Sequence, residues 1–245
     1  MIHSPPLQAI FFDIDDTLFS TSSFAEKARK RSIDSMIRLG WKVDPEKAYQ
    51  ELLEVIAEFS PNYGSHFDKL VLRMGESCSE GINSAILIAQ AIVSYHDAKN
   101  ELLHPYPEVL PFFRMLAKTN LALGIITDGL TIKQSEKIIR LGIYPFLNPR
   151  FIFISEQLGI SKPNPKIYQF ASQRCRIPTN QIMYIGDNPN NDIVPANKVG
   201  MITVRYVRDG KHRQPSCTVS PTHEIQNFEQ LREILKNQYQ IELKE

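Results

Sequence analysis

Residues 9–18 read AIFFDIDDTL, an apolar run followed by three acids within four positions. The apolar part has the composition of a buried strand, and Asp13, Asp15 and Asp16 come directly after it. Like charges this close repel one another, and a carboxylate that loses its hydration is costly, so a purely structural role is hard to justify. The stretch therefore predicts a strand that ends in a helix cap, a metal site or a catalytic centre.

The composition is that of an ordinary globular protein. The chain has 245 residues, of which 42% are hydrophobic and 22% charged, and its formal net charge is +1. This length suits one large domain or a core with a smaller companion, and the near-neutral charge provides no global field for nucleic acid or an acidic membrane. Cys78, Cys175 and Cys217 are too widely spaced to form a metal-ligand pair or a disulfide framework.

Neither a signal sequence nor a membrane-spanning segment stands out in the sequence. The N-terminal MIHSPPLQ lacks a cationic region followed by an apolar one, and the most apolar helical run, residues 82–93, is too short to span a bilayer. We therefore expect a cytoplasmic protein, monomeric or dimeric, with no nucleic-acid or membrane partner.

Four further apolar runs have the character of the first. Their nearly continuous hydrophobicity is typical of parallel strands that are covered on both faces. Amphipathic segments of helix length, 131–141 and 165–175, lie between the later runs, and a last helix is expected after Asn227. The expected strands are 7–12, 121–126, 151–154, 182–185 and 201–206. This alternation predicts an α/β fold with a doubly wound parallel sheet.

One connection is far too long for a simple crossover. More than a hundred residues separate the first two expected strands, and most of them follow amphipathic helical patterns. We expect helices at 23–39, 48–59, 67–74 and 82–103, and a segment at 108–118 that returns to the sheet. The sequence therefore predicts a helical cap, residues 19–104, inserted into an α/β core of residues 1–18 and 105–245.

Polar residues follow the carboxyl ends of four expected strands. These ends meet at one edge of an open parallel sheet, in the crevice where ligands bind. Each cluster has an ordinary explanation of its own, as a helix cap, a turn, a solvated lysine or an Asx-rich loop. Their joint arrangement favours a common site. The residues are Asp13 after the first strand, Thr127, Asp128 and Gly129 after the second, Lys162 beyond the third, and Asp187 and Asp192 after the fourth.

These groups together suit phosphoryl transfer. Converging carboxylates favour a hard cation such as Mg²⁺, while a lysine, a hydroxyl and the N–H groups of a Gly-containing turn favour a phosphate. An ionised Asp13 can attack phosphorus to form an aspartyl-phosphate, and Asp15 can protonate the leaving oxygen and later activate water. The metal and Lys162 would offset the repulsion between the anionic nucleophile and the anionic substrate.

The segments DIDDT, ITDG, SKPNP and GDNPNND, in this order, resemble the four motifs of the haloacid dehalogenase (HAD) superfamily. The resemblance covers nearly the whole chain and is to the phosphatases with a helical C1 cap. It implies a Rossmann-like core and Mg²⁺ as the cofactor. The implied roles are Asp13 as nucleophile, Asp15 as general acid and base, Thr127, Asp128, Gly129 and Lys162 as phosphate-binding residues, Asp13, the backbone carbonyl of Asp15 and Asp187 as metal ligands, and Asp192 as a supporting residue.

Asp15 separates the candidate reactions. Dehalogenases of the superfamily generally lack this second acid, because a halide leaving group needs no proton, so its presence favours phosphate-ester hydrolysis. A 2-haloacid dehalogenase, a phosphomutase and a non-catalytic phospho-acceptor or binding protein remain alternatives. We expect a small phosphorylated substrate, namely a sugar phosphate, a triose phosphate, phosphoglycolate or a nucleoside monophosphate, and the sequence leaves the choice open.

Overall fold

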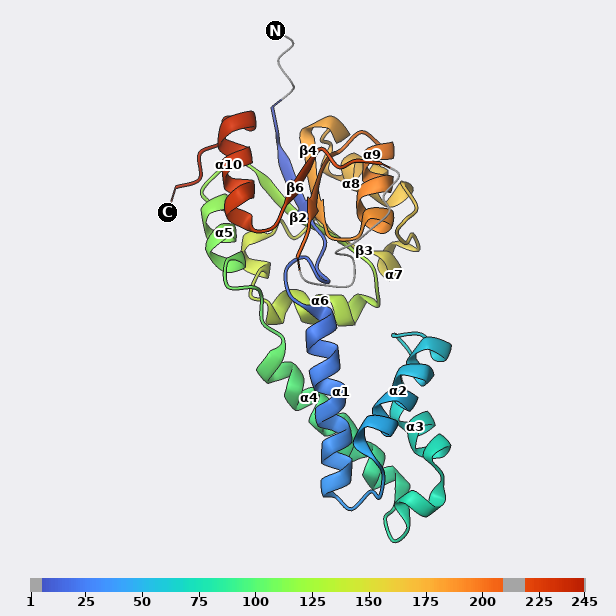
Figure 1. The fold of residues 1–245 in the computed structure, drawn as a ribbon. Coiled ribbons are helices and arrows are strands. Elements are labelled where there is room, and N and C mark those ends of the chain that lie inside the picture. The colour runs from blue at the N-terminus through green and yellow to red at the C-terminus, as the bar shows by residue number, and fades with distance from the viewer. Residues whose placement is uncertain (1–5, 209–218, 245) are drawn as a thin grey trace. The chain divides into compact units, whose positions relative to one another are not determined.

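The computed structural model describes residues 6–208 and 219–244 (Figure 1). The chain separates into two compact units, one made of Met1–Ser20 and His104–Glu245 and the other of Thr21–Leu103. Cys78 and Cys175 are free thiols, whereas Cys217 lies outside the described residues. In the part of the chain that is described, no helix has both the length and the apolar character needed to cross a membrane.

The first unit is built on a six-stranded sheet in the order β3-β2-β1-β4-β5-β6, with every pair of neighbours parallel. The predicted α/β class with a doubly wound sheet is therefore confirmed. The strands are β1 (Ala9–Phe12), β2 (Ala122–Thr127), β3 (Ile152–Ile154), β4 (Ile182–Gly186), β5 (Ile202–Tyr206) and β6 (His223–Ile225). The sequence interpretation missed β6, because its three residues, HEI, carry neither a long apolar run nor a period-two pattern.

The two phenylalanines of β1 pack on opposite faces of the sheet, as adjacent strand residues must. Phe11 belongs to a buried cluster with Tyr168 of α8 (Lys166–Cys175) and Ala196 of α9 (Val194–Lys198). Phe12 contacts Phe113 of α5 (Val109–Leu116) and Phe228 of α10 (Phe228–Tyr239), with ring centroids 4.7 and 6.2 Å apart. In Figure 1, α5 and α10 accordingly cover one face and α8 and α9 the other. Burial on both faces explains why the strands read as continuous apolar runs.

Local capping signals mark two of these helices. The Asn227 side chain accepts a hydrogen bond from the backbone N–H of Gln230 (3.0 Å) and so caps α10 as expected. The Asn164 side chain accepts from the N–H of Lys166 (3.0 Å), where α8 begins, although Pro165 and not Asn164 holds the N-cap position of this helix. The unit also contains α6 (Thr131–Arg140), α7 (Ser155–Leu158), short 3₁₀ turns at Tyr144–Phe146 and Thr179–Gln181, and a π-helical turn at Pro189–Ile193.

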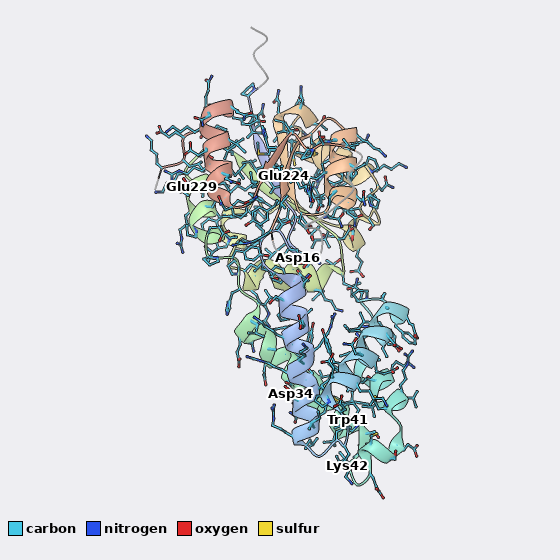
Figure 2. The ribbon with its side chains drawn as sticks, viewed as in Figure 1. Asp16, Asp34, Trp41, Lys42, Glu224 and Glu229 are labelled. Atoms are coloured by element: carbon cyan, nitrogen blue, oxygen red, sulfur yellow. The ribbon has the colours of Figure 1, made fainter. Side chains whose placement is uncertain are left out.

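The second unit is helical and has a hydrophobic core of its own. Its helices are α1 (Thr21–Arg38), α2 (Pro45–Phe59), α3 (His66–Met74) and α4 (Ser84–Leu102), with a 3₁₀ turn at Glu76–Ser79. Trp41, the only tryptophan of the chain, is 1% exposed within that core (Figure 2). Asp44 caps α2 by accepting from the N–H of Lys47 at 2.8 Å. That this unit acts as a cap stays a prediction.

Candidate active site

The carboxyl ends of the central strands enclose a small polar hollow of about 150 Å³. The parallel register produces it, because Phe12 pairs with both Ile125 of β2 and Ile185 of β4, so the residues that follow these strands meet at one edge. The lining contains every residue predicted for the site except Gly129. The lining residues are Asp13, Asp15, Asp16, Thr127, Asp128, Lys162, Asp187, Asn188, Asn191 and Asp192.

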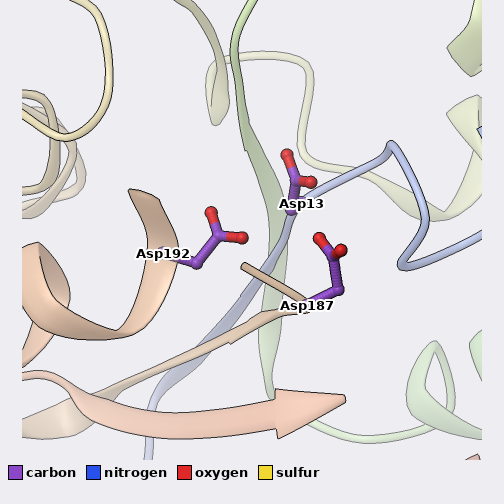
Figure 3. A group of neighbouring side chains, drawn as sticks. All are labelled: Asp13, Asp187 and Asp192. Carbon is purple, nitrogen blue, oxygen red and sulfur yellow. The ribbon is translucent and has the colours of Figure 1, made fainter. Parts of the chain in front are cut away.

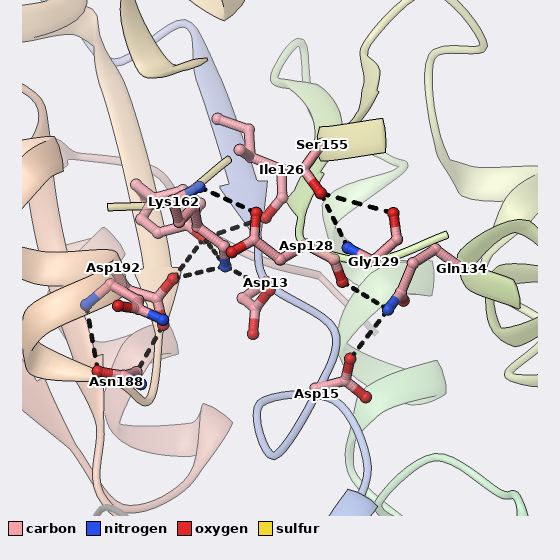
Figure 4. Close-up of polar contacts among 12 residues, drawn as sticks. Asp13, Asp15, Ile126, Asp128, Gly129, Gln134, Ser155, Lys162, Asn188 and Asp192 are labelled. Carbon is pink, nitrogen blue, oxygen red and sulfur yellow. Dashed lines mark hydrogen bonds and ion pairs between the residues drawn. The ribbon is translucent and has the colours of Figure 1, made fainter. Parts of the chain in front are cut away.

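Lys162 lies at the centre of the polar network (Figure 4). Its Nζ is 2.7 Å from Asp13 Oδ1, 2.7 Å from Asp192 Oδ1 and 3.2 Å from the hydroxyl of Tyr184. Only 4% of the lysine side chain is exposed. Burial by itself lowers the pKa of Lys162, but the neighbouring carboxylates of Asp13 and Asp192 raise it well above its usual range. The ammonium therefore stays charged and holds two carboxylates in place.

The carboxylates of the hollow are short of positive charge. Burial, opposed by Lys162 but reinforced by Asp192 and Asp15, raises the pKa of Asp13 to about 7, and burial raises the pKa of Asp187 to about 9. Asp13, Asp187 and Asp192 each offer an oxygen within 4.8 Å of the others (Figure 3). The ammonium of Lys162 forms ion pairs with two of them, Asp13 and Asp192. Because this ammonium pairs with only two of the three converging carboxylates, they keep an excess of negative charge, which fits a divalent cation such as Mg²⁺.

Asp192 is held by hydrogen bonds on both of its carboxylate oxygens. Besides Lys162, its Oδ1 lies 2.9 Å from the Tyr184 hydroxyl, and its Oδ2 accepts from the backbone N–H of Asn188 at 3.0 Å. The Asp192 side chain can pack against the backbone of residue 186 because this residue is a glycine. A Cβ on Gly186 would lie 2.5 Å from the Asp192 carboxyl carbon. These contacts suit Asp192 to supporting Lys162 and leave Asp13 and Asp187 as the stronger candidates for metal ligands.

The end of β2 and the segment that follows it have polar contacts that the sequence did not indicate. The Thr127 hydroxyl is fully buried and has no hydrogen-bond partner among the described residues, so it can donate to an incoming oxygen. The carboxylate of Asp128 accepts from the backbone N–H of Lys162 at 3.0 Å, so it orders the Lys162 loop. The N–H of Gly129 donates to Ser155 Oγ at 2.9 Å. Gly129 is not among the residues that line the hollow, and its predicted role in phosphate binding stays a prediction.

Asp15 has polar partners that the sequence interpretation missed. Both of its carboxylate oxygens lie close to Nζ of Lys137, at 2.6 and 2.7 Å, and Oδ2 accepts from Nε2 of Gln134 at 3.1 Å. Gln134 and Lys137 belong to α6 and lie three residues apart, so they share a helix face. Tyr184, in the middle of β4, was missed too. A buried tyrosine within an otherwise apolar strand was the available signal, because its hydroxyl needs a polar partner.

Comparison with known proteins places these motifs in a family. A family model described as haloacid dehalogenase-like hydrolase matches residues 7–200. A protein of Methanopyrus kandleri named glyceraldehyde 3-phosphate phosphatase is 42% identical over 209 residues, which cover 84% of this chain and 86% of the relative. A protein of the same name from Methanocaldococcus jannaschii is 38% identical and covers 94% of this chain and 98% of its own length.

Solved structures show the same architecture. The 2-haloacid dehalogenase of Pseudomonas syringae aligns with a TM-score of 0.64 and 27% identity, and the alignment covers 94% of this chain and 98% of that one. This likeness supports the assignment of the fold.

Proposed function

Because the chain belongs to the family of haloacid dehalogenase-like hydrolases, we propose that it is a Mg²⁺-dependent phosphatase of a small phosphate monoester, with glyceraldehyde 3-phosphate as the first candidate. The substrate is carried over from the named relatives in Methanopyrus and Methanocaldococcus. The observation that supports phosphate chemistry is the pair of carboxylates, Asp13 and Asp15, that lines one hollow with the buried ammonium of Lys162.

Asp13 is the proposed nucleophile. Lys162 lies 2.7 Å from one oxygen of its carboxylate, which orients the group and leaves the other oxygen to attack. A bond forms between this oxygen and phosphorus while the bond from phosphorus to the leaving oxygen breaks. The ammonium also lessens the repulsion between Asp13 and the anionic phosphate, because it is buried where water cannot screen its charge.

Asp15 is the proposed proton donor and acceptor. It gives its proton to the leaving oxygen as the aspartyl-phosphate forms, and it then takes a proton from the water that attacks phosphorus. That second step releases inorganic phosphate and restores the Asp13 carboxylate. An acid at this position serves an ester, whose alkoxide leaving group needs a proton, and has no use for a halide.

Thr127 and Lys162 are the proposed phosphate ligands, since the first brings an unpaired buried hydroxyl and the second a buried cation. We propose that Asp13, Asp187 and the backbone carbonyl of Asp15 hold Mg²⁺. When bound, the metal supplies the positive charge that the clustered carboxylates lack and neutralises charge on the reacting phosphoryl group. Asp192 supports the site through Lys162.

The cap role of residues 19–104, a cytoplasmic location and a monomeric or dimeric state belong to the same proposal and stay predictions. The near-neutral net charge supports a small diffusible substrate over a nucleic acid or a membrane surface.

Phosphate release from glyceraldehyde 3-phosphate, with and without Mg²⁺, tests the proposal. A panel of sugar phosphates, phosphoglycolate and nucleoside monophosphates tests the substrate, and a 2-haloacid tests the dehalogenase alternative. Asp13→Asn should abolish release, and Asp15→Asn should lower turnover of alkyl phosphates by about 10²- to 10⁴-fold. Halide release without phosphate release would refute the phosphatase assignment.

Asp16→Asn is the matched control for these variants. Asp16 is the third acid of the cluster and has a positive φ of 55°, which asparagine tolerates. The control should keep most of the activity, whereas wild-type turnover by Asp13→Asn would contradict the nucleophile assignment.

A further inference from the structure

The Asp15 carboxylate is held from one side by α6. Its two oxygens lie 2.6 and 2.7 Å from Nζ of Lys137, and Oδ2 also lies 3.1 Å from Nε2 of Gln134. In Figure 4 the Asp15 side chain accordingly points toward Gln134. Three contacts on two oxygens fix the plane of a carboxylate more firmly than one contact would, and those to the ammonium are charge-assisted.

Gln134 is itself anchored. Its residue is 4% exposed, and the same Nε2 donates to the backbone carbonyl of Asp128 at 2.7 Å. Gln134 therefore links the segment after β2 to Asp15, which follows β1. Because the helix face that carries Gln134 also carries Lys137, one rigid element positions both partners of the carboxylate.

Lys137 has a second contact with the loop that carries Asp15. Its Nζ lies 5.7 Å from the ring centroid of Phe19, which is 1% exposed, and the backbones of Asp15 and Phe19 form a bridge. The ammonium thus meets this loop at two points, which limits where it can place the carboxylate. The Asp15 side chain keeps 30% exposure and lines the hollow, so a molecule bound there can reach its carboxylate.

Lys162 does not orient the Asp15 carboxylate. It is committed to Asp13 and Asp192, each 2.7 Å from its Nζ. The two lysines therefore serve different carboxylates, Lys162 those of Asp13 and Asp192, and Lys137 that of Asp15. Proton transfer in a transition state depends steeply on the placement of the acid, so a residue that orients Asp15 affects the chemistry without touching the phosphate.

We propose that Lys137, supported by Gln134, is a positioning residue that orients Asp15 for proton transfer to the leaving oxygen. The inference rests on the proposed function, because it assigns a helper to the acid of that reaction. Lys137 should matter most for esters whose leaving group needs a proton and least for esters whose leaving group departs unaided.

The test compares kcat/KM on an alkyl phosphate, glycerol 3-phosphate, with kcat/KM on p-nitrophenyl phosphate, whose leaving group is activated. Lys137→Met should lower the first by about tenfold or more and the second far less, since only the first depends on general acid catalysis. Lys137→Arg, which keeps the cation, should recover part of the loss. The inhibition constant for inorganic phosphate should stay unchanged, because Lys137 does not bind the phosphoryl group.

Lys118→Met serves as the matched control, since this lysine is exposed just after α5. It should leave both substrates at the wild-type value. Retained p-nitrophenyl phosphate turnover in Lys137→Met shows that the variant is folded. An equal loss on both esters, or a weaker inhibition by phosphate, would overturn the positioning role.

A double variant separates this inference from the proposed function. If Lys137 acts through Asp15, adding Lys137→Met to Asp15→Asn should cause no further loss on glycerol 3-phosphate. A further loss as large as that of the single variant would overturn the inference alone. Wild-type activity in Asp15→Asn, or no phosphate release by the unmodified enzyme, would overturn the proposed function and the inference with it.

Discussion

Gly186→Ala should break the support of the catalytic lysine from a distance. Gly186 ends β4, and a Cβ built on it would lie 2.5 Å from Cγ, 2.6 Å from Oδ2 and 2.7 Å from Cβ of Asp192. The obstacle includes the Cβ of a side chain that is 1% exposed, so it cannot be removed by rotating a flexible tip. Asp192 has to move away, and its contacts with Lys162, Tyr184 and Asn188 stretch or break.

The expected loss in the free energy of unfolding has two components. Forcing an extra methyl group into a packed interior costs about 1–3 kcal/mol. Loss of one hydrogen bond of the buried Asp192 carboxylate adds about 1.5–3 kcal/mol, because the carboxylate is a charged acceptor. We therefore expect Gly186→Ala to lower the free energy of unfolding by about 3 kcal/mol or more. Turnover should fall as well, since Lys162 loses one of the two carboxylates that hold it.

Urea unfolding followed by far-UV circular dichroism measures the effect. Fluorescence of Trp41 reports the unfolding of the helical unit, because this single tryptophan lies in that unit's core. Gly186 lies in the α/β unit, so the loss of stability should appear in the circular dichroism transition.

Gly64→Ala is the matched control, because its added Cβ would meet nothing within 4 Å. It should be neutral or stabilise by up to about 1 kcal/mol. A Gly186→Ala protein within about 0.5 kcal/mol of the wild type would show that Asp192 moves aside without losing its contacts.

Further predictions concern the lysine, the buried hydroxyl and the metal-free carboxylates. Lys162→Met should lower the free energy of unfolding by about 3–5 kcal/mol at pH 8 in urea melts, because it strands two buried carboxylates; an unchanged midpoint would contradict this. Thr127→Val should leave that free energy nearly unchanged, because the hydroxyl has no partner to lose among the described residues, but should weaken inhibition by phosphate about tenfold. Equal inhibition would exclude Thr127 as a ligand. In the metal-free folded protein, Asp187 has a pKa of about 9 and Asp13 a pKa of about 7, whereas both carboxyl groups lose their protons near pH 4 in the unfolded chain. Thermal stability in EDTA should therefore fall as pH rises from about 4 to about 9. Asp187→Asn and Mg²⁺ should each reduce that slope, and a flat wild-type profile would count against the metal site.

Much of the site could be predicted from the sequence because its main residues follow directly after strands. A run such as AIFF declares a buried strand by composition, and parallel topology then brings the residues after each strand to one edge. Asp13 and Asp187, which follow β1 and β4, and Thr127, which ends β2, were predictable in this way. Lys162 follows β3 less directly, since several residues separate it from that strand, and its place in the site was inferred from its occurrence together with the other polar clusters.

The hydrogen-bond partner of Gly129 could not be predicted from the motif ITDG. Its N–H donates to the hydroxyl of Ser155, at the start of α7, and its role in phosphate binding stays a prediction. A local motif records which donors exist but not which acceptors the rest of the chain brings to them.

Periodicity and composition were enough to predict β1 to β5, most helices, the inserted helical segment and the order of the four polar motifs, because these depend on residues near one another in the chain. Tertiary structure alone decided the partner of each charge. Lys137 and Asp15 are 122 positions apart and meet only when α6 packs beside the loop after β1, and Tyr184 reaches Lys162 and Asp192 only across the folded sheet edge. β6 likewise becomes a strand by pairing with β5, since Ile225 is the only one of its three residues with a strong strand preference. Coulomb and hydrogen-bond energies depend on distance in space, which a linear pattern does not encode.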